Sequence, residues 1–348
     1  MFSKSIATKG GDVFRDEKSL AFDGSNDYVE LGGTFSYNVH SISAWVKPTA
    51  IVGSSTIFDY RDANNDGIHL RLADGDVVYE IDNTDGHYDS VLTLNQWWHI
   101  VATNDGSTST IYVNGVSVET ADTSGETINV SSSAIPRIGA RSHTSADNYF
   151  NGNISEVAIY NSALTINQVK TIYNGREPYN HKEGVASGNL QSWYRMGDGA
   201  LDDFNLIGDE TNATLGSDLI TNGGFDADSD WTKDNFSIGS GVATTSTNGA
   251  SIEQSISISV GDVIKIVAEI KNYTSGSIRY YTGSGVDEYR TFNSNGVHTH
   301  YLVANSTKVL FYSQSFNGSL DNVKVYKVNG NAGTMINMDI VDIEGDTP

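Results

Sequence analysis

Apolar and polar residues alternate with a period of two through most of this chain, in short runs that end at glycine, asparagine, aspartate or serine. Such alternation is typical of strands with one buried side and one solvent-facing side. The clearest case lies at 94–118, where it predicts strands over 97–102 and 108–113. Asn114-Gly115 predicts a tight turn, because both residues tolerate the positive φ that a two-residue hairpin requires. The expected buried positions of these strands are Ile100, Ala102, Ile111 and Val113.

The period changes at 163–174, where the apolar residues recur as on one face of a helix. Thr165 and Gln168 have the spacing of a capping box, and Asn174-Gly175 is a stop signal. These signals predict one short helix. Its apolar face would carry Leu164, Ile166, Val169, Ile172 and Tyr173.

A second strongly alternating segment lies at 255–271. Its spacing predicts a hairpin with a turn at Val260-Gly261-Asp262. One row of side chains is apolar and the other is mixed, so we expect one face to be buried and the other to be wet. The apolar row is Ile264, Ile266, Ala268 and Ile270.

Five segments, in this order, resemble a laminin-G-like or pentraxin-like domain of the concanavalin A-type jelly roll. They are SLAFDGSNDYVELG at 19–32, SISAWVKP at 41–48, IFDYRDANNDGIHLRL at 57–72, QWWHIVATNDGSTSTIYVNG at 96–115 and ISEVAIYNSALTINQVKTIYN at 154–174. Residues 218–328 resemble the jelly-roll carbohydrate-binding modules of the family 4/9 type. That resemblance depends on LITNGGFDADSDWT at 219–232, the segment 255–271 and SLDNVKVYKV at 319–328.

Together these features predict an all-β chain of two tandem antiparallel β-sandwich (jelly-roll) domains, with one short helix that closes the first. The predicted parts are an N-terminal arm at 1–18, the laminin-G-like sandwich at 19–176, a linker at 177–217, the second jelly roll at 218–328 and a C-terminal tail at 329–348. Apolar residues such as Met335 and Met338 suit the tail for docking, either on its own chain or on a partner.

Composition limits the function. The chain has 348 residues, a formal net charge of −22 and no cysteine. The acidity argues against nucleic acid and anionic lipid as partners, and the lack of cysteine excludes thiol chemistry.

We find no apolar run long enough to insert in a membrane and no signal peptide at the start. We therefore expect synthesis and retention in the cytoplasm, unless the protein leaves in a particle or by lysis.

Catalysis was considered because glycoside hydrolases of the laminarinase type share the resembled fold and carry Glu-x-Asp-x-(x)-Glu on one strand. This chain has Glu80-Ile81-Asp82-Asn83-Thr84-Asp85. The last member is aspartate, and the segment from Asn83 to Gly86 predicts a turn, so the third carboxylate would leave the strand. We therefore expect the protein not to be an enzyme.

Calcium is the one cofactor that the resemblances imply. Asp62, Asn64, Asn65 and Asp66 occupy the place of a first pentraxin calcium loop, whereas the second loop has Ala140-Arg141-Ser142-His143, with an arginine where a cation would lie. Aspartate and asparagine are also ordinary turn residues, which is the simpler interpretation of the first loop. Modules of the second resembled type often hold a structural calcium ion, and Asp226 and Asp321 occupy the corresponding positions.

Sugar binding requires aromatic rings beside polar groups, because the C–H faces of a sugar stack on rings. The candidate platforms in the second domain are Trp231, Tyr280, Tyr281, Tyr289 and Tyr301, with His298 and His300 nearby in sequence. Each ring taken alone is more often a packing residue than a platform.

Two function classes follow. The first is a non-enzymatic structural protein on the virion surface of a tailed bacteriophage, such as a capsid decoration, head fibre or tail-associated adhesion protein. Its expected partners are other virion proteins, further copies of itself and host-surface polysaccharide. It is suggested by the tandem sandwiches, the acidity and the resemblance of 193–199 and 333–338 to modules of phage particle proteins. The alternative is a bacterial extracellular carbohydrate-binding, lectin-like protein, and a glycoside hydrolase ranks third.

Overall fold

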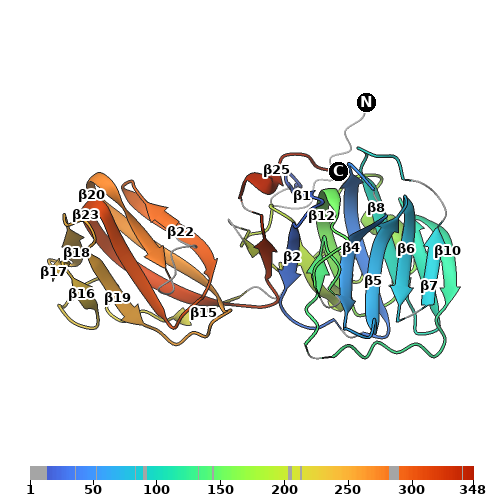
Figure 1. Cartoon of the computed structure of the whole chain (residues 1–348), viewed down its shortest axis with the longest axis horizontal. Coiled ribbons are helices and arrows are strands. Elements are labelled where there is room, and N and C mark those ends of the chain that lie inside the picture. Colours follow the sequence, from blue (N-terminus) through green and yellow to red (C-terminus); the bar gives the residue numbers. More distant parts are fainter. Residues whose placement is uncertain are drawn as a thin grey trace. The chain divides into compact units, whose positions relative to one another are not determined.

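The computed structural model describes residues 14–348 except residues 36, 52, 83, 89–91, 132, 143–144, 203–205, 212–213, 282–289 and 339. Nearly all the regular structure in these residues is antiparallel strand, so the predicted all-β fold is confirmed (Figure 1). The chain forms two units. The first unit consists of the chain up to 212 together with 331–348, and the second consists of 213–330. The second unit is therefore an insertion in the sequence of the first.

Two sheets form the first unit. The first sheet has the strand order β10-β9-β8-β3-β12-β1-β25, and β13 pairs with β12 outside this path. Its strands are β1 (Ser19–Asp23), β3 (His40–Pro48), β8 (Trp98–Asn104), β9 (Thr108–Val113), β10 (Val116–Asp122), β12 (Asn151–Tyr160), β13 (Leu190–Tyr194) and β25 (Ile343–Glu344).

The second sheet of the first unit has the order β14-β24-β2-β11-β4-β5-β6-β7. Its strands are β2 (Tyr28–Leu31), β4 (Ser54–Arg61), β5 (Gly67–Ala73), β6 (Asp76–Ile81), β7 (Thr84–Tyr88), β11 (Arg137–Ile138), β14 (Leu206–Ile207) and β24 (Gly333–Ile336). One apolar core combines inward-facing side chains of both sheets, among them Val46, Ile100 and Ile154 of the first and Phe58, Leu70 and Tyr79 of the second.

The hairpin predicted around 94–118 is present as β8 and β9. Strand β9 has the predicted bounds, whereas β8 begins and ends one to two residues later than expected. Asn114 and Gly115 have φ angles of 49° and 77°, as the turn requires. All four predicted core residues are at most 7% exposed, so the alternation correctly identified the buried face.

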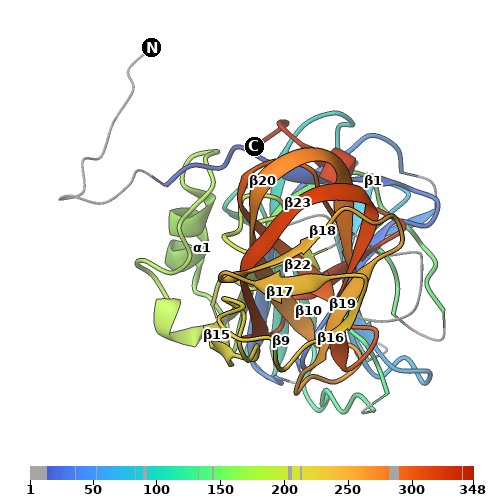
Figure 2. The ribbon, with the colours of Figure 1, turned by 90° about the vertical axis from the view of Figure 1, so that its left-hand side faces the viewer.

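The predicted helix is α1 (Ile166–Tyr173), labelled in Figure 2. Thr165 and Gln168 form the predicted capping box, and Asn174 ends the helix with a left-handed φ of 49°. Val169 and Ile172 are buried in a smaller apolar cluster on the outer side of the first sheet. Ile166 is 36% exposed, which differs from the prediction, because it lies in the first turn at the edge of that contact.

The segment expected as a linker, 177–217, belongs largely to the first unit. It contains the 3-10 turn η1 (Ser187–Asn189), then β13, which pairs with β12, and β14, which pairs with β24. Trp193 and Tyr194 are at most 2% exposed. Their rings are buried in the first unit. The prediction of a linker was therefore wrong for this stretch, because the polar composition around 180 does not extend to the whole segment.

The C-terminal segment packs on its own chain. Strand β24 pairs with β2, and β25 pairs with β1 after the 3-10 turn η2 (Ile340–Asp342). Met335 and Met338 belong to the core of the first unit. Of the two docking modes expected for the tail, the structure has the one on the same chain.

Residues 1–13 of the expected N-terminal arm lie outside the described residues. The rest of the arm lies on the first unit, where the ring of Phe14 is 5.8 Å from that of Trp193. The backbone N–H of Lys18 donates to Asp198 Oδ2 at 2.8 Å.

In the described part of the chain, no helix is long and apolar enough to cross a membrane.

The second unit is built on two long strands, β20 and β23, which pair with each other (Figure 2). Its described strands are β15 (Thr214–Asp218), β16 (Thr232–Asp234), β17 (Ser237–Gly239), β18 (Val242–Thr245), β19 (Ser251–Ser255), β20 (Val263–Tyr281), β21 (Arg290–Phe292), β22 (Gly296–Val303) and β23 (Lys308–Asn329). The predicted apolar row of β20, from Ile264 to Ile270, is at most 1% exposed.

The hairpin predicted over 255–271 is wrong in its pairing. The chain does turn at Gly261, which has a φ of 91°. However, β19 pairs with β16 and β23, and β20 pairs with β21, β22 and β23. Residues 310–312 of β23 pair with β19 on one edge and with β20 on the other. The two strands are neighbours in sequence, but β23 separates them in the sheet.

Candidate functional site

Two of the aromatic rings expected as sugar platforms lie in the core of the second unit. Trp231 is 7% exposed; its Nε1 donates to the Asn222 carbonyl at 3.1 Å, and its ring packs 5.2 Å from that of Phe225. Tyr280 is fully buried and stacks on Phe292 at 4.6 Å. The assignment of these two rings as platforms is therefore corrected, because protein atoms already cover their faces.

The remaining aromatic candidates give a similar result. Tyr281 and Tyr301 are 7% and 8% exposed, and the Lys265 ammonium lies 5.5 Å from the centroid of the Tyr301 ring. The ring of His298 lies 4.8 Å from that of Phe292, at an interplanar angle of 33°. Tyr289 lies outside the described residues. The described candidates thus contribute to packing and offer no broad exposed ring face for a sugar.

The two aspartates expected to hold a structural calcium ion have different surroundings. Asp226 is exposed, whereas Asp321 is 6% exposed. The ammonium of Lys271 donates to Asp321 Oδ2 at 2.6 Å and also pairs with Glu269 at 3.2 Å. Across the described ranges, no three His, Asp or Glu side chains are grouped to hold a metal. The calcium site stays a prediction.

The loop between β4 and β5 contains the other calcium candidates, Asn65 and Asp66. Its geometry is that of a turn capped by Asp62, whose Oδ1 accepts the backbone N–H of Asn64 at 2.8 Å and of Asp66 at 3.3 Å. Burial raises the pKa of Asp62, but these bonds and one from the Ser131 N–H outweigh it and lower that pKa. Turn formation therefore accounts for this loop without a metal.

The carboxylates of the hydrolase-like motif bind different partners. Glu80 accepts a hydrogen bond from Arg61 Nη1 at 2.9 Å. Asp82 has a φ of 51° beyond the end of β6, and its Oδ1 accepts the N–H of Gly67 at 2.8 Å. The side chain of Asp85 is outside the described part. Glu80 and Asp82 are thus not arranged as a catalytic pair on one strand.

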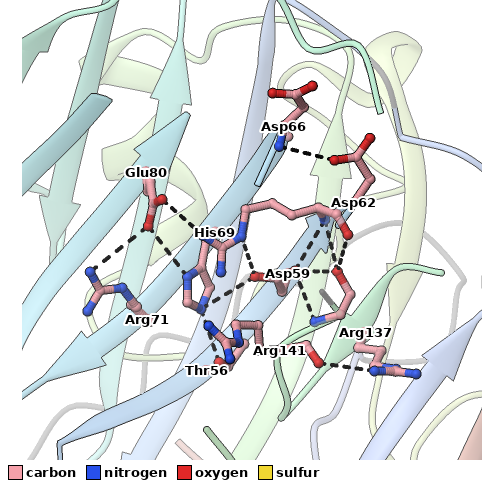
Figure 3. A network of polar contacts seen from close by, with 12 residues as sticks. Thr56, Asp59, Asp62, Asp66, His69, Arg71, Glu80, Arg137 and Arg141 are labelled. Carbon is pink, nitrogen blue, oxygen red and sulfur yellow. Dashed lines mark hydrogen bonds and ion pairs between the residues drawn. The ribbon is translucent and has the colours of Figure 1, made fainter. Parts of the chain in front are cut away.

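Strands β4, β5 and β6 instead assemble a network of polar side chains on the face of their sheet opposite the core (Figure 3). Asp59, His69 and Glu80 come from these three strands and lie close together there. Alternation places them on this face, because their neighbours Phe58 and Leu70 point into the core. The second sheet therefore has one apolar face and one charged face.

Arg61 is the centre of the network. Its Nε donates to Asp59 Oδ2 and its Nη1 to Glu80 Oε1, both at 2.9 Å. The three side chains are 4%, 0% and 14% exposed. Arg71 Nη2 lies 4.0 Å from Glu80 Oε2 on the other side. Each carboxylate therefore has a guanidinium partner, which offsets the cost of burying its charge.

His69 lies between the two carboxylates. Its Nε2 is 3.0 Å from Thr56 Oγ1 and 3.5 Å from Asp59 Oδ2, and its Nδ1 is 3.7 Å from Glu80 Oε2. Burial lowers the pKa of His69 to about 3, although Asp59 acts in the opposite direction. The imidazole is therefore neutral at neutral pH and has no proton to spare as a general acid.

Ser142 contacts the network from a distant part of the chain. The N–H of Ser142 donates to Asp59 Oδ1 at 3.0 Å, and its hydroxyl accepts the N–H of Arg61 at 2.9 Å. Arg141 binds Asp147 through both its Nε and its Nη2. The pentraxin resemblance places its second calcium loop at 140–143, and in the structure Arg141 of this stretch pairs with Asp147.

No sequence motif pointed to Asp59, Arg61 or His69. The available signal was the alternation of charged with apolar residues inside strands that are otherwise core-like, as in Phe58-Asp59-Tyr60-Arg61. Charged residues at alternate positions predict a polar face. They do not predict that Ser142, 83 residues beyond Asp59, contacts this face.

Comparison with known proteins identifies the fold of the first unit. Residues 23–170 match the family model described as the concanavalin A-like lectin/glucanases superfamily (Laminin_G_3). The chain thus contains a concanavalin A-like jelly-roll domain, as the laminin-G-like resemblance implied. None of the curated proteins matches the chain.

Solved structures with a similar fold include a putative carbohydrate-binding protein from Bacteroides ovatus, with 21% identity, a TM-score of 0.47 and coverage of 57% of this chain and 56% of that one. The heptameric SAP-like pentraxin from Limulus polyphemus has 19% identity, a TM-score of 0.42 and coverage of 48% and 87%. Domain 4 of an extracellular arabinanase from Geobacillus stearothermophilus, in complex with arabinotriose, has 23% identity and a TM-score of 0.38. The match covers 47% of this chain and 82% of that one. This chain spans about half the length of the first structure.

Proposed function

We propose that this protein is a non-catalytic carbohydrate-binding protein of the lectin-like type. Of the two function classes expected from the sequence, this is the alternative. The matched superfamily includes both lectins and glucanases, so it supports carbohydrate as the ligand class but leaves the choice between binding and hydrolysis open. The virion assignment gains no support from that match.

The observation that favours binding over hydrolysis is the pairing of Glu80 with arginine side chains. A glycoside hydrolase needs two carboxyl groups, one of them a proton donor with a raised pKa. Here Glu80 Oε1 accepts a hydrogen bond from Arg61 Nη1 at 2.9 Å, and Glu80 Oε2 lies 4.0 Å from Arg71 Nη2, so both oxygens of this carboxylate face guanidinium groups. Asp59 on the neighbouring strand is bound by the same Arg61. Both carboxylates are thus structural partners of arginine.

The test uses the whole purified chain on a panel of neutral and acidic polysaccharides and on a glycan array. We expect retention on at least one class of glycan without release of reducing sugar. The control is Glu80→Gln. Release of reducing sugar by the wild type that this variant abolishes would show that Glu80 is catalytic, and a complete lack of glycan binding would remove the proposal itself.

A further inference from the structure

The second unit has a cavity of about 440 Å³ whose lining is entirely uncharged. Apart from one glycine, every lining residue has an amide or a hydroxyl group. The lining residues are Asn235, Ser237, Thr244, Thr245, Ser246, Thr247, Asn272, Asn317, Gly318 and Ser319. The volume lies within the range of roughly 300–1,000 Å³ that is usual for small-molecule sites.

The cavity is lined by residues of β17 and β18, of the loops next to them, and of the middle of β20 and β23. Strand β20 is irregular there: its register against β23 shifts between Lys271 and Ser275, and Asn272 has a φ of 54°. Gly318 lies opposite Thr245 on β18. The bulge at Asn272 interrupts the regular ladder and forms one wall of the cavity.

Apolar residues support the polar lining from beneath. Phe236 and Phe316 are 6% and 0% exposed, and each is adjacent in sequence to lining residues that are exposed. A Cβ atom at Gly318 would lie 2.7 Å from the Phe316 ring, so only glycine fits there without a shift. Both rings belong to the core of the second unit, so the strands that present the lining are packed on that core.

Some of the lining groups are used within the protein. The Thr245 hydroxyl donates to the Asn235 carbonyl at 2.8 Å, and Asn272 Nδ2 contacts Ser319 Oγ at 3.5 Å. Within the part of the chain that the structure describes, the side chains of Asn317 and Ser246 have no hydrogen-bond partner. Asn317 offers two donors and one acceptor oxygen, and Ser246 offers one donor and one acceptor.

We infer that this cavity binds an uncharged saccharide unit, a class of ligand that rests on the proposed carbohydrate-binding function. Amides and hydroxyls both donate and accept hydrogen bonds, as do sugar hydroxyls, so the lining can satisfy a ligand of that kind. A charged ligand would lose its hydration without meeting an opposite charge in the lining. The cavity is separate from the arginine network of the first unit.

The experiment measures binding of the full chain to neutral oligosaccharides and to sialyllactose by calorimetry. The variant Asn317→Ala/Ser246→Ala removes two exposed lining side chains that have no partner among the described residues. Asn293→Ala/Ser294→Ala is the matched control, because both of its residues are exposed in the same unit but outside the cavity. We expect a neutral oligosaccharide to bind, with affinity lowered by roughly tenfold or more in the first variant, the loss expected for two hydrogen bonds. The control should bind as the wild type does, and affinity should not change with salt.

The outcomes separate this inference from the proposed function. Glycan binding that the Asn317→Ala/Ser246→Ala variant leaves unchanged would overturn the cavity assignment and leave the proposed function intact. Tighter binding of sialyllactose than of any neutral sugar would also overturn it. If no saccharide binds to the wild type, both the cavity assignment and the proposed function fail.

Discussion

The two polar regions of this protein differ in how their hydrogen-bonding groups are used. The network of the first unit is charged and buried, and Arg61 binds both Asp59 and Glu80. The cavity of the second unit is uncharged, and in it the exposed side chains of Asn317 and Ser246 have no partner among the described residues. Buried charges that are paired with one another stabilise a fold, whereas neutral groups that lack partners are available to a ligand.

The largest expected effect comes from Arg61→Ala. This substitution tests whether the network of the first unit stabilises the fold, as the comparison requires. The change leaves Asp59 and Glu80 buried without their shared cation, so we expect a loss of about 3–5 kcal/mol in the free energy of unfolding of the first unit. Denaturant unfolding would measure it. Arg15→Ala is the control, because that side chain is 72% exposed and its pair with Glu17 contributes little. Equal midpoints for the two variants would contradict the structural role.

The next effect concerns Asp16, a half-buried residue of the first unit. Asp16 lies beside Glu156, whose carboxylate accepts from Trp193 Nε1 at 2.5 Å and from Arg195 Nε at 3.2 Å. Burial raises the pKa of Asp16 to about 7, and the charge of Asp198 acts in the same direction. Burial raises the pKa of Glu156 as well, with Asp16 as the second cause.

Because the folded-state pKa of Asp16 lies above the unfolded value, the folded protein holds more protons than the unfolded chain between about pH 4 and 7. The stability contributed by this group is therefore complete below that window and is lost as the pH rises through it. In Asp16→Asn we expect the fall to be less steep, by at most roughly 1.4 kcal/mol per pH unit. Chemical unfolding at several pH values would measure this. Glu177→Gln, at an exposed position, should retain the slope of the wild type; an unchanged slope in Asp16→Asn would refute the assignment.

The smallest expected effect sharpens the description of the second unit. If calcium binds between Asp226 and Asp321, the melting temperature should be higher in calcium than in EDTA, and Asp321→Asn should remove the difference. We expect the rise to be small, because the Lys271 ammonium already lies 2.6 Å from Asp321 Oδ2. Equal melting temperatures in the two conditions would reject the calcium prediction. Lys271→Met is the companion variant, since it frees the carboxylate and should enlarge any calcium effect.

Features that depend on neighbouring residues were predictable from the sequence. The turn at Asn114-Gly115, the capping box of Thr165 and Gln168, and the apolar row of β20 are each specified within a few residues. Backbone preferences and side-chain alternation act over that range, so a single segment carries the information. The class of fold was predictable for another reason. Five segments in order resemble a laminin-G-like domain, and the match to the concanavalin A-like superfamily covers the same part of the chain.

The tertiary structure alone decided which groups meet. Ser142 reaches Asp59 from 83 residues away, and β24 returns after the whole second unit to pair with β2. It also decided that Trp231 and Tyr280 pack in a core, and that β19 and β20 both pair with β23. An aromatic or charged residue has the same local signal whether it faces solvent, a ligand or another strand. Its role is set by the residues from elsewhere in the chain that cover it, because burial and hydrogen-bond partners arise only when distant segments pack together.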